Sequence, residues 1–72
     1  MVVISTLIAV AKTGSRLIVD TTGYSEENLV KLVEEVKTHD GHITLKNIKK
    51  KKFLFINTIA SIGKSHVTLD YS

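Results

Sequence analysis

Three short segments of the chain share one alternation of apolar and polar residues. They are Arg16–Asp20, His42–Lys46 and His66–Asp70, and each begins with a polar or basic residue and ends on a charged one. An alternation with a period of two is typical of a β-strand that buries one face. The pattern predicts strands over residues 16–20, 42–47 and 66–71. The side chains expected to face the core are Leu17, Val19, Ile43, Leu45, Val67 and Leu69.

A helical spacing of apolar residues precedes the second and third of these strands. Leu29, Leu32, Val33 and Val36 follow the spacing i, i+3, i+4, i+7, which predicts a helix over residues 26–38. Ser25 stands where an N-cap is expected. A third helix is predicted from about Lys51 to Ile62. Its expected buried face consists of Phe55, Ile56, Ile59, Ala60 and Ile62.

The segment before the first strand is ambiguous by itself. The β-branched residues of 2–13 favour a strand. The segment Thr6–Lys12, however, resembles Asn57–Gly63, and each of the two precedes one of the repeated strands. An internal repeat is stronger evidence than single-residue propensity, so we predict a helix over residues 3–12.

These elements predict a single α/β domain of three helix–strand units, at about 1–20, 21–47 and 48–72. Helical crossovers between parallel strands are right-handed, so the helices should lie on one face of a sheet with strand order 1-2-3. The structure should therefore have two layers, with the second face of the sheet open to water. The residues expected on that open face are Ile18, Asp20, His42, Thr44, Lys46, His66, Thr68 and Asp70.

This plan resembles the leucine-rich repeats in its period and layout. The resemblance is architectural and covers nearly the whole chain. The family's leucine ladder and asparagine are echoed only at Ile43–Asn47. Proteins of this architecture mostly bind other proteins, so the resemblance implies a protein partner and identifies no binding residue.

The small size of the chain favours self-association. The chain has 72 residues and no cysteine, which excludes disulfides, thiol catalysis and cysteine-based zinc sites. Its 43% content of hydrophobic residues is high for so small a domain. The sheet has two open edges, and an edge strand such as 66–71 is expected to pair antiparallel with its copy in a homodimer. Higher assembly through the apolar first helix is a further option. The alternative is that the chain end or the first helix crowds the edge.

A run of lysines is the main candidate binding feature. Lys46 and Lys49, Lys50, Lys51 and Lys52 carry no acidic neighbour, in a chain of net charge +3. Lysines at a helix N-terminus oppose the helix dipole, so their position lacks a structural reason. Contact with nucleic acid or with an acidic protein is one interpretation, since Phe53 and Phe55 could stack on bases. The alternative is a solvated loop beside buried phenylalanines.

The histidines and acids allow a weaker hypothesis of metal binding or catalysis. His39, His42 and His66, with Asp40, have types and spacings that a zinc or nickel site uses. Arg16 holds the position of His42 and His66 in the first unit, which favours a polar strand start instead. Asp20, Lys46 and Asp70 are expected to form a surface ladder. We therefore predict no metal and no cofactor.

The N-terminal segment gives evidence on where in the cell the protein is expected. No charged residue precedes Lys12, so the apolar residues lack the basic start of a secretory signal, and they are too few to span a bilayer. We expect a cytoplasmic protein that does not enter a membrane. Its predicted function is that of a non-enzymatic interaction protein that self-associates and binds a macromolecule. A nucleic-acid-binding module is the alternative, and an enzyme using His42, His66 and Asp70 ranks third.

Overall fold

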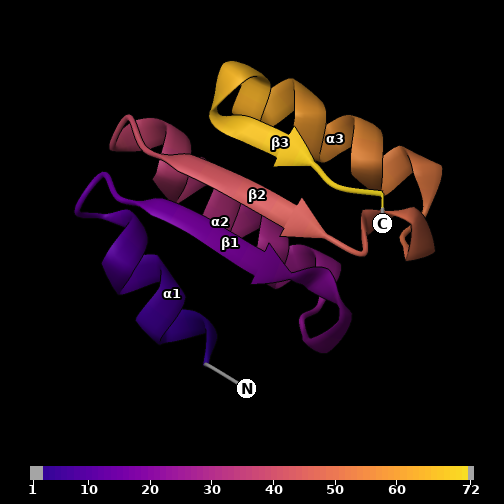
Figure 1. The fold of residues 1–72 in the computed structure, drawn as a ribbon, viewed down its shortest axis with the longest axis horizontal. Helices are drawn as coiled ribbons and strands as arrows, with labels where there is room; N and C mark the ends of the chain where they lie inside the picture. Colours follow the sequence, from indigo (N-terminus) through magenta and orange to yellow (C-terminus); the bar gives the residue numbers. More distant parts are fainter. Residues whose placement is uncertain (1–2, 72) are drawn as a thin grey trace.

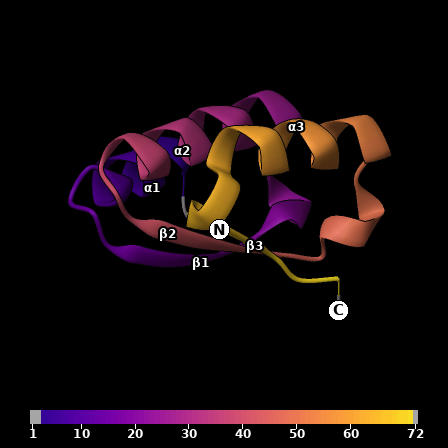
Figure 2. The ribbon, with the colours of Figure 1, turned by 90° about the horizontal axis from the view of Figure 1, so that it is seen from above.

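The computed structural model describes residues 3–71 and shows three helix–strand units. In chain order the elements are α1 (Ile4–Ala11), β1 (Arg16–Asp20), α2 (Glu26–Thr38), β2 (His42–Lys46), α3 (Phe53–Gly63) and β3 (Val67–Leu69). The three strands form a parallel sheet in the order β1-β2-β3 (Figure 1). Figure 2 shows the helices together on one side of this sheet. The predicted fold class and two-layer arrangement are confirmed.

The strand register aligns the three repeated segments with one another. Arg16 pairs with His42 and Asp20 with Lys46 at the two ends of the β1–β2 ladder. Between β2 and β3, Ile43 pairs with Val67 and Leu45 with Leu69. Equivalent positions of the units therefore lie side by side across the sheet, and their apolar residues form rows under the helices.

The core is centred on the middle unit. On α2, the four apolar residues of the predicted stripe, Leu29, Leu32, Val33 and Val36, are fully buried, and so are Ile43 and Leu45 of β2. The N-terminus of α2 is capped as expected, because the backbone N–H of Asn28 donates to Ser25 Oγ at 3.2 Å. The bounds predicted for this helix agree with the structure.

Helix α3 differs from the prediction at both ends. It begins at Phe53, because Lys51 and Lys52 have extended backbones with ψ near 160° and 145°. Ala60 was expected in the core but is exposed, whereas Gly63 is buried. A Cβ at Gly63 would collide with the side chain of Val67, so the glycine lets α3 close onto β3. Helix α3 has a neighbouring helix, α2, on one side only. Its buried residues face that side, and Ala60 is exposed.

The second and third strands are shorter than expected. Asn47 has a left-handed backbone with φ of 58°, which ends β2 at Lys46. His66 belongs to a 3₁₀ turn, Lys64–His66, and Asp70 lies beyond the end of β3. The chain still runs beside β2 after Leu69, since the Asp70 N–H donates to the Leu45 carbonyl at 2.9 Å.

The turns that follow β1 and β2 contribute buried side chains that the sequence pattern did not indicate. Both are 3₁₀ turns, Thr21–Gly23 and Ile48–Lys50. Thr21 is fully buried and donates through Oγ1 to the Lys46 carbonyl at 2.8 Å. Ile48 is fully buried in the hydrophobic core. Each turn is therefore fixed to the sheet.

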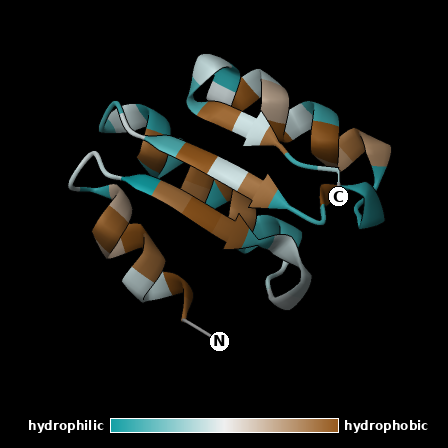
Figure 3. Ribbon diagram, in the orientation of Figure 1, coloured by the Kyte–Doolittle hydropathy of each residue, from teal (hydrophilic) through white to brown (hydrophobic). Residues whose placement is uncertain are grey.

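The second face of the sheet is open, as predicted. Figure 3 looks onto this face and shows polar and apolar residues alternating along β2, with a more continuous apolar run along β1. Ile18 projects from the open face with 74% of its surface exposed. This side chain is the main apolar exception on a face of otherwise mostly polar residues.

Candidate interaction surfaces

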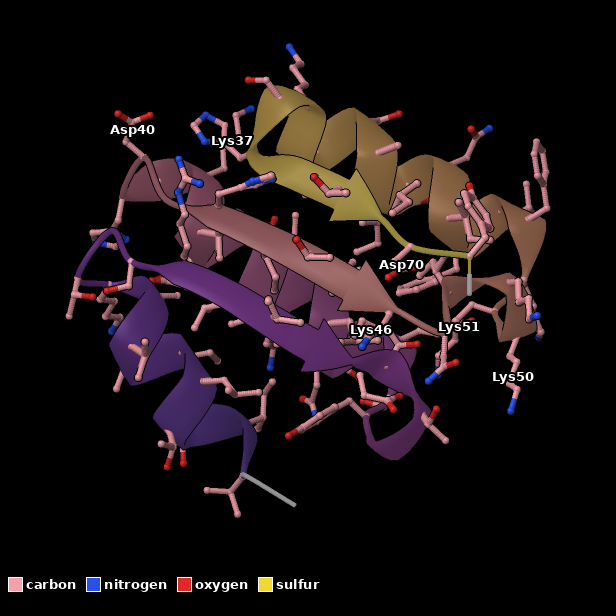
Figure 4. The ribbon with its side chains drawn as sticks, viewed as in Figure 1. Lys37, Asp40, Lys46, Lys50, Lys51 and Asp70 are labelled. Carbon is pink, nitrogen blue, oxygen red and sulfur yellow. The ribbon has the colours of Figure 1, made fainter. Side chains whose placement is uncertain are left out.

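The carboxyl ends of the strands gather several of the predicted site residues. Figure 4 shows Lys46, Lys50, Lys51 and Asp70 at this end of the molecule, while Lys37 and Asp40 lie at the opposite end. Lys46 ends β2, Lys50 and Lys51 lie in the turn that follows it, and Asp70 lies in the segment after β3. Tertiary structure therefore joins the lysine run to the C-terminal part of the described chain.

The lysine-bearing turn is anchored on both sides of β2. Asn47 donates through Nδ2 to Asp20 Oδ2 at 2.9 Å, which ties the turn to the end of β1. The Ile48 N–H donates to the Asp70 carbonyl at 3.3 Å, which ties it to the segment after β3. With the Ile48 side chain in the core as well, the turn holds a defined position.

One lysine of the run has a structural role. Lys51 is half-buried, and its Nζ donates to the Tyr24 carbonyl at 3.2 Å. This bond links the turn after β2 to the loop before α2. Lys51 therefore presents less of its charge to a partner than the other lysines of the run.

The remaining lysines are exposed, and three large apolar side chains are exposed on the neighbouring segments. Within residues 3–71, no ion pair within 4 Å involves Lys46, Lys49, Lys50 or Lys52. Phe53 is 72% exposed, Leu54 75% and Tyr71 53%, whereas Phe55 is buried in the core. We call this surface the basic corner, and it consists of Lys46, Lys49, Lys50, Lys52, Phe53, Leu54 and Tyr71.

Asp20 borders the basic corner and is held in its ionised form. Hydrogen bonds from Thr22, then one from Asn47, and the nearby charge of Lys46 lower the pKa of Asp20 to about 2. The Thr22 N–H donates to Asp20 Oδ1 at 2.9 Å. Asp20 lies opposite Lys46 in the sheet, but its hydrogen bonds go to the turns. Its role is that of a turn-stabilising anion.

The histidines make separate contacts near the amino ends of the strands. His66 donates through Nδ1 to the Gly41 carbonyl at 2.8 Å, and His42 Nε2 lies 2.9 Å from Thr68 Oγ1. His39 Nδ1 lies 3.0 Å from the Glu35 carbonyl. Among residues 3–71, no group of three or more His, Asp or Glu side chains is placed to hold a metal ion. His66 Nε2 lies 3.8 Å from Asp40 Oδ1, but within this part of the chain His39 and His42 do not join that pair to form a metal site.

A second surface lies at the free edge of β1. A depression of about 520 Å³ opens there, lined by Leu7 of α1, by Ile18–Asp20 and by Thr22–Tyr24. Val3 and Val10 of the N-terminal segment are also exposed, at 63% and 38%. We call α1, β1 and this depression the open end. The sequence signal for it is the lack of any charged residue before Lys12.

Comparison of the chain with protein-family models, curated proteins and solved structures finds no match. The helices between residues 3 and 71 are all too short or too polar to cross a membrane. The two surfaces themselves therefore carry the functional argument.

Proposed function

We propose that this chain is a non-enzymatic interaction protein that self-associates through the open end and binds a macromolecular partner. The observation that carries the proposal is the exposure of apolar residues where α1 and β1 leave a depression, with Ile18 74% exposed at its rim. An apolar edge of this kind is what a second chain covers.

The open end lacks the features that close a repeat structure. In repeat proteins each unit buries the apolar face of its neighbour, and the terminal units need a polar outer side to remain soluble. Helix α1 has no charged residue, and Ala11 is its one buried residue. By contrast, α2 has two charged residues in its first turn and four buried apolar residues. A second copy would supply the cover that α1 and β1 lack.

The charges of β1 favour pairing with its own copy over a continuous chain of copies. An antiparallel pairing centred on Ile18 places Arg16 opposite Asp20 of the second copy, and Ile18 opposite Ile18. A parallel continuation of the existing register would instead place Asp70 beside Asp20, two like charges. The two-fold arrangement also brings α1 next to its copy and covers its exposed valines. It therefore predicts a closed dimer.

This arrangement moves the expected interface from the third strand to the first. Strand β3 has only Val67–Leu69 in strand conformation, and His66 lies in the preceding turn. Strand β1 has five residues and an exposed isoleucine at its centre. The longer strand offers more backbone groups for pairing and more apolar area to cover.

Binding rather than catalysis also fits the polar residues. A general acid needs a pKa near the working pH, whereas that of Asp20 is about 2. His66 is engaged with a backbone carbonyl and His42 with a threonine hydroxyl. The cytoplasm remains the location we propose, on the sequence argument alone.

Light scattering over a range of protein concentrations tests the proposal. We expect the mass of a dimer for the unchanged protein and that of a monomer for Ile18→Lys, because the new charges would face each other across the two-fold axis. Leu54→Lys is the matched control, since Leu54 is equally exposed, at 75%, but lies on α3. A monomeric unchanged protein, or an Ile18→Lys variant that still dimerises, contradicts the proposal.

A further inference from the structure

We propose that the basic corner is a binding site for single-stranded nucleic acid. The lysines would contact phosphates, and the exposed aromatic rings would stack on bases. This site is independent of the proposed self-association, because it is built from the end of β2, the turn before α3, the start of α3 and the segment after β3. Either proposal can therefore fail without the other.

The charge of the corner fits a polyanion. Four lysines from Lys46 to Lys52 are exposed without an ion-pair partner within 4 Å in the part of the chain that the structure describes, and they outnumber the two carboxylates at this end, Asp20 and Asp70. They precede a helix whose N-cap residue, Lys52, makes no side-chain capping bond. Like charges at this position repel one another and oppose the helix dipole. A bound phosphate backbone relieves both effects and releases counterions.

The exposure of the two phenylalanines separates a core role from a binding role. Phe53 and Phe55 are two residues apart on α3, so they point to nearly opposite sides of the helix. Phe55 is 7% exposed and packs in the core, whereas Phe53 is 72% exposed and contributes little to it. Tyr71 is brought near the same turn by the bond from the Ile48 N–H to the Asp70 carbonyl. Two exposed aromatic rings beside lysines are the arrangement that single-strand binders use.

The anchoring of the corner favours binding. The buried Ile48 side chain, the Asn47–Asp20 bond and the Lys51–Tyr24 bond fix the turn from three directions. Lys49 and Lys50 therefore project from a backbone that is already ordered. Binding then has to order side chains but not the backbone, which lowers its entropic cost.

The shape of the corner favours a nucleic-acid strand over an acidic peptide or a duplex. The apolar depression described above lies at the open end, and neither Phe53 nor Leu54, which are 72% and 75% exposed, lines it. A peptide partner usually inserts side chains into a groove or adds to a strand edge. In a duplex the bases are stacked on one another, so an exposed ring gains no contact with them.

Fluorescence anisotropy with a labelled oligothymidylate of about fifteen nucleotides tests this site. We expect log Kd to rise with log salt, with a slope of at most about 3, since each of four phosphate contacts contributes about 0.7. The triple change Lys49→Gln, Lys50→Gln and Lys52→Gln should weaken binding and reduce this slope. Phe53→Ala should weaken binding about tenfold and leave the slope unchanged, because stacking releases no counterions.

The matched control changes the same number of charges elsewhere. Lys12→Gln, Lys37→Gln and Lys64→Gln alter exposed lysines outside the corner and should leave most of the affinity intact. An equal loss in the control would mean that only the net charge matters, and the site would be wrong. The same conclusion follows if the oligonucleotide does not bind at low salt, or if Phe53→Ala has no effect.

Two competitors separate the alternative partners. A duplex of the same length and a polyglutamate peptide should each displace the labelled strand less well than unlabelled oligothymidylate. If the duplex competes equally, stacking is not part of recognition. If polyglutamate competes better, the corner recognises an acidic protein, and the nucleic-acid proposal is wrong.

Discussion

The middle unit and the first unit follow the same helix–strand plan, but they differ in how completely they are covered. Leu29, Leu32 and Val33 of α2 are fully buried, whereas Val3 and Val10 beside and within α1 are 63% and 38% exposed. The difference does not come from apolar content, because α1 is the more apolar helix. It comes from neighbours, since α2 packs between α1 and α3, whereas α1 has a helix on one side only. How far a helix is buried in this fold thus depends on whether it has a neighbouring helix on both sides.

The third unit is the other end of the stack and is finished differently. Helix α3 also has one helical neighbour, yet its exposed end is flanked by lysines. The first unit therefore exposes an apolar side suited to a second copy, whereas the turn that leads into α3 carries the charges suited to a polyanion. Two ends with the same architecture carry different proposed interactions.

Truncating one leucine in each helix should show the largest contrast between the units. Leu32→Ala removes a fully buried side chain and should lower the free energy of unfolding by about 2–5 kcal/mol. Leu7→Ala, on the half-buried face of α1, should lower it by roughly 1 kcal/mol, because less apolar area is lost. Urea unfolding at one protein concentration measures both. Equal losses would show that α1 is as well covered as α2.

Helix capping offers a second contrast, between α2 and α3. Ser25→Ala removes the bond to the Asn28 N–H and should destabilise the fold by about 1 kcal/mol. Lys52→Asp places a capping side chain where the N-cap residue makes no side-chain bond and should stabilise the fold by roughly 0.5–1 kcal/mol. Thermal melts test both changes. The same Lys52→Asp variant should bind oligothymidylate more weakly, so a gain in both properties would argue against a binding role for Lys52.

The smallest expected effect on stability comes from the hydrogen bonds of the Asp20 carboxylate, which join the first unit to the second. Its folded pKa of about 2 lies below the unfolded value of about 3.9, so its contribution is complete above pH 4. That contribution is lost as the pH falls from about 4 to 2. Asp20→Asn should therefore show a shallower fall in the unfolding midpoint over this range than the unchanged protein.

Periodicity was sufficient to predict the architecture. The alternation in Arg16–Asp20 and its two repeats predicted the three strands, the last two longer than they are, and the stripe from Leu29 to Val36 predicted α2 with its bounds. The parallel order followed because right-handed crossovers leave few alternatives. These features depend on residues close together in the sequence, and a local pattern records them directly.

The candidate sites were only partly predictable. The lysine run was evident, and the helical spacing placed Phe55 on the buried face of α3, but the exposure of Phe53 is seen only in the structure. Lys51 belonged to the same run, yet it bonds to Tyr24, twenty-seven residues away in the chain. His42 and His66 shared a position in the repeat, but the first bonds to Thr68 and the second to the Gly41 carbonyl.

The sequence by itself thus determined the elements, their order and the excess of positive charge after β2. The tertiary structure decided how far each side chain is buried and which partner each polar group bonds to. Ile48 enters the core because Asn47 takes a left-handed conformation and bonds to Asp20. Gly63 is buried because α3 closes on Val67. Such contacts join distant segments, and a periodic pattern holds no information about which segments will meet.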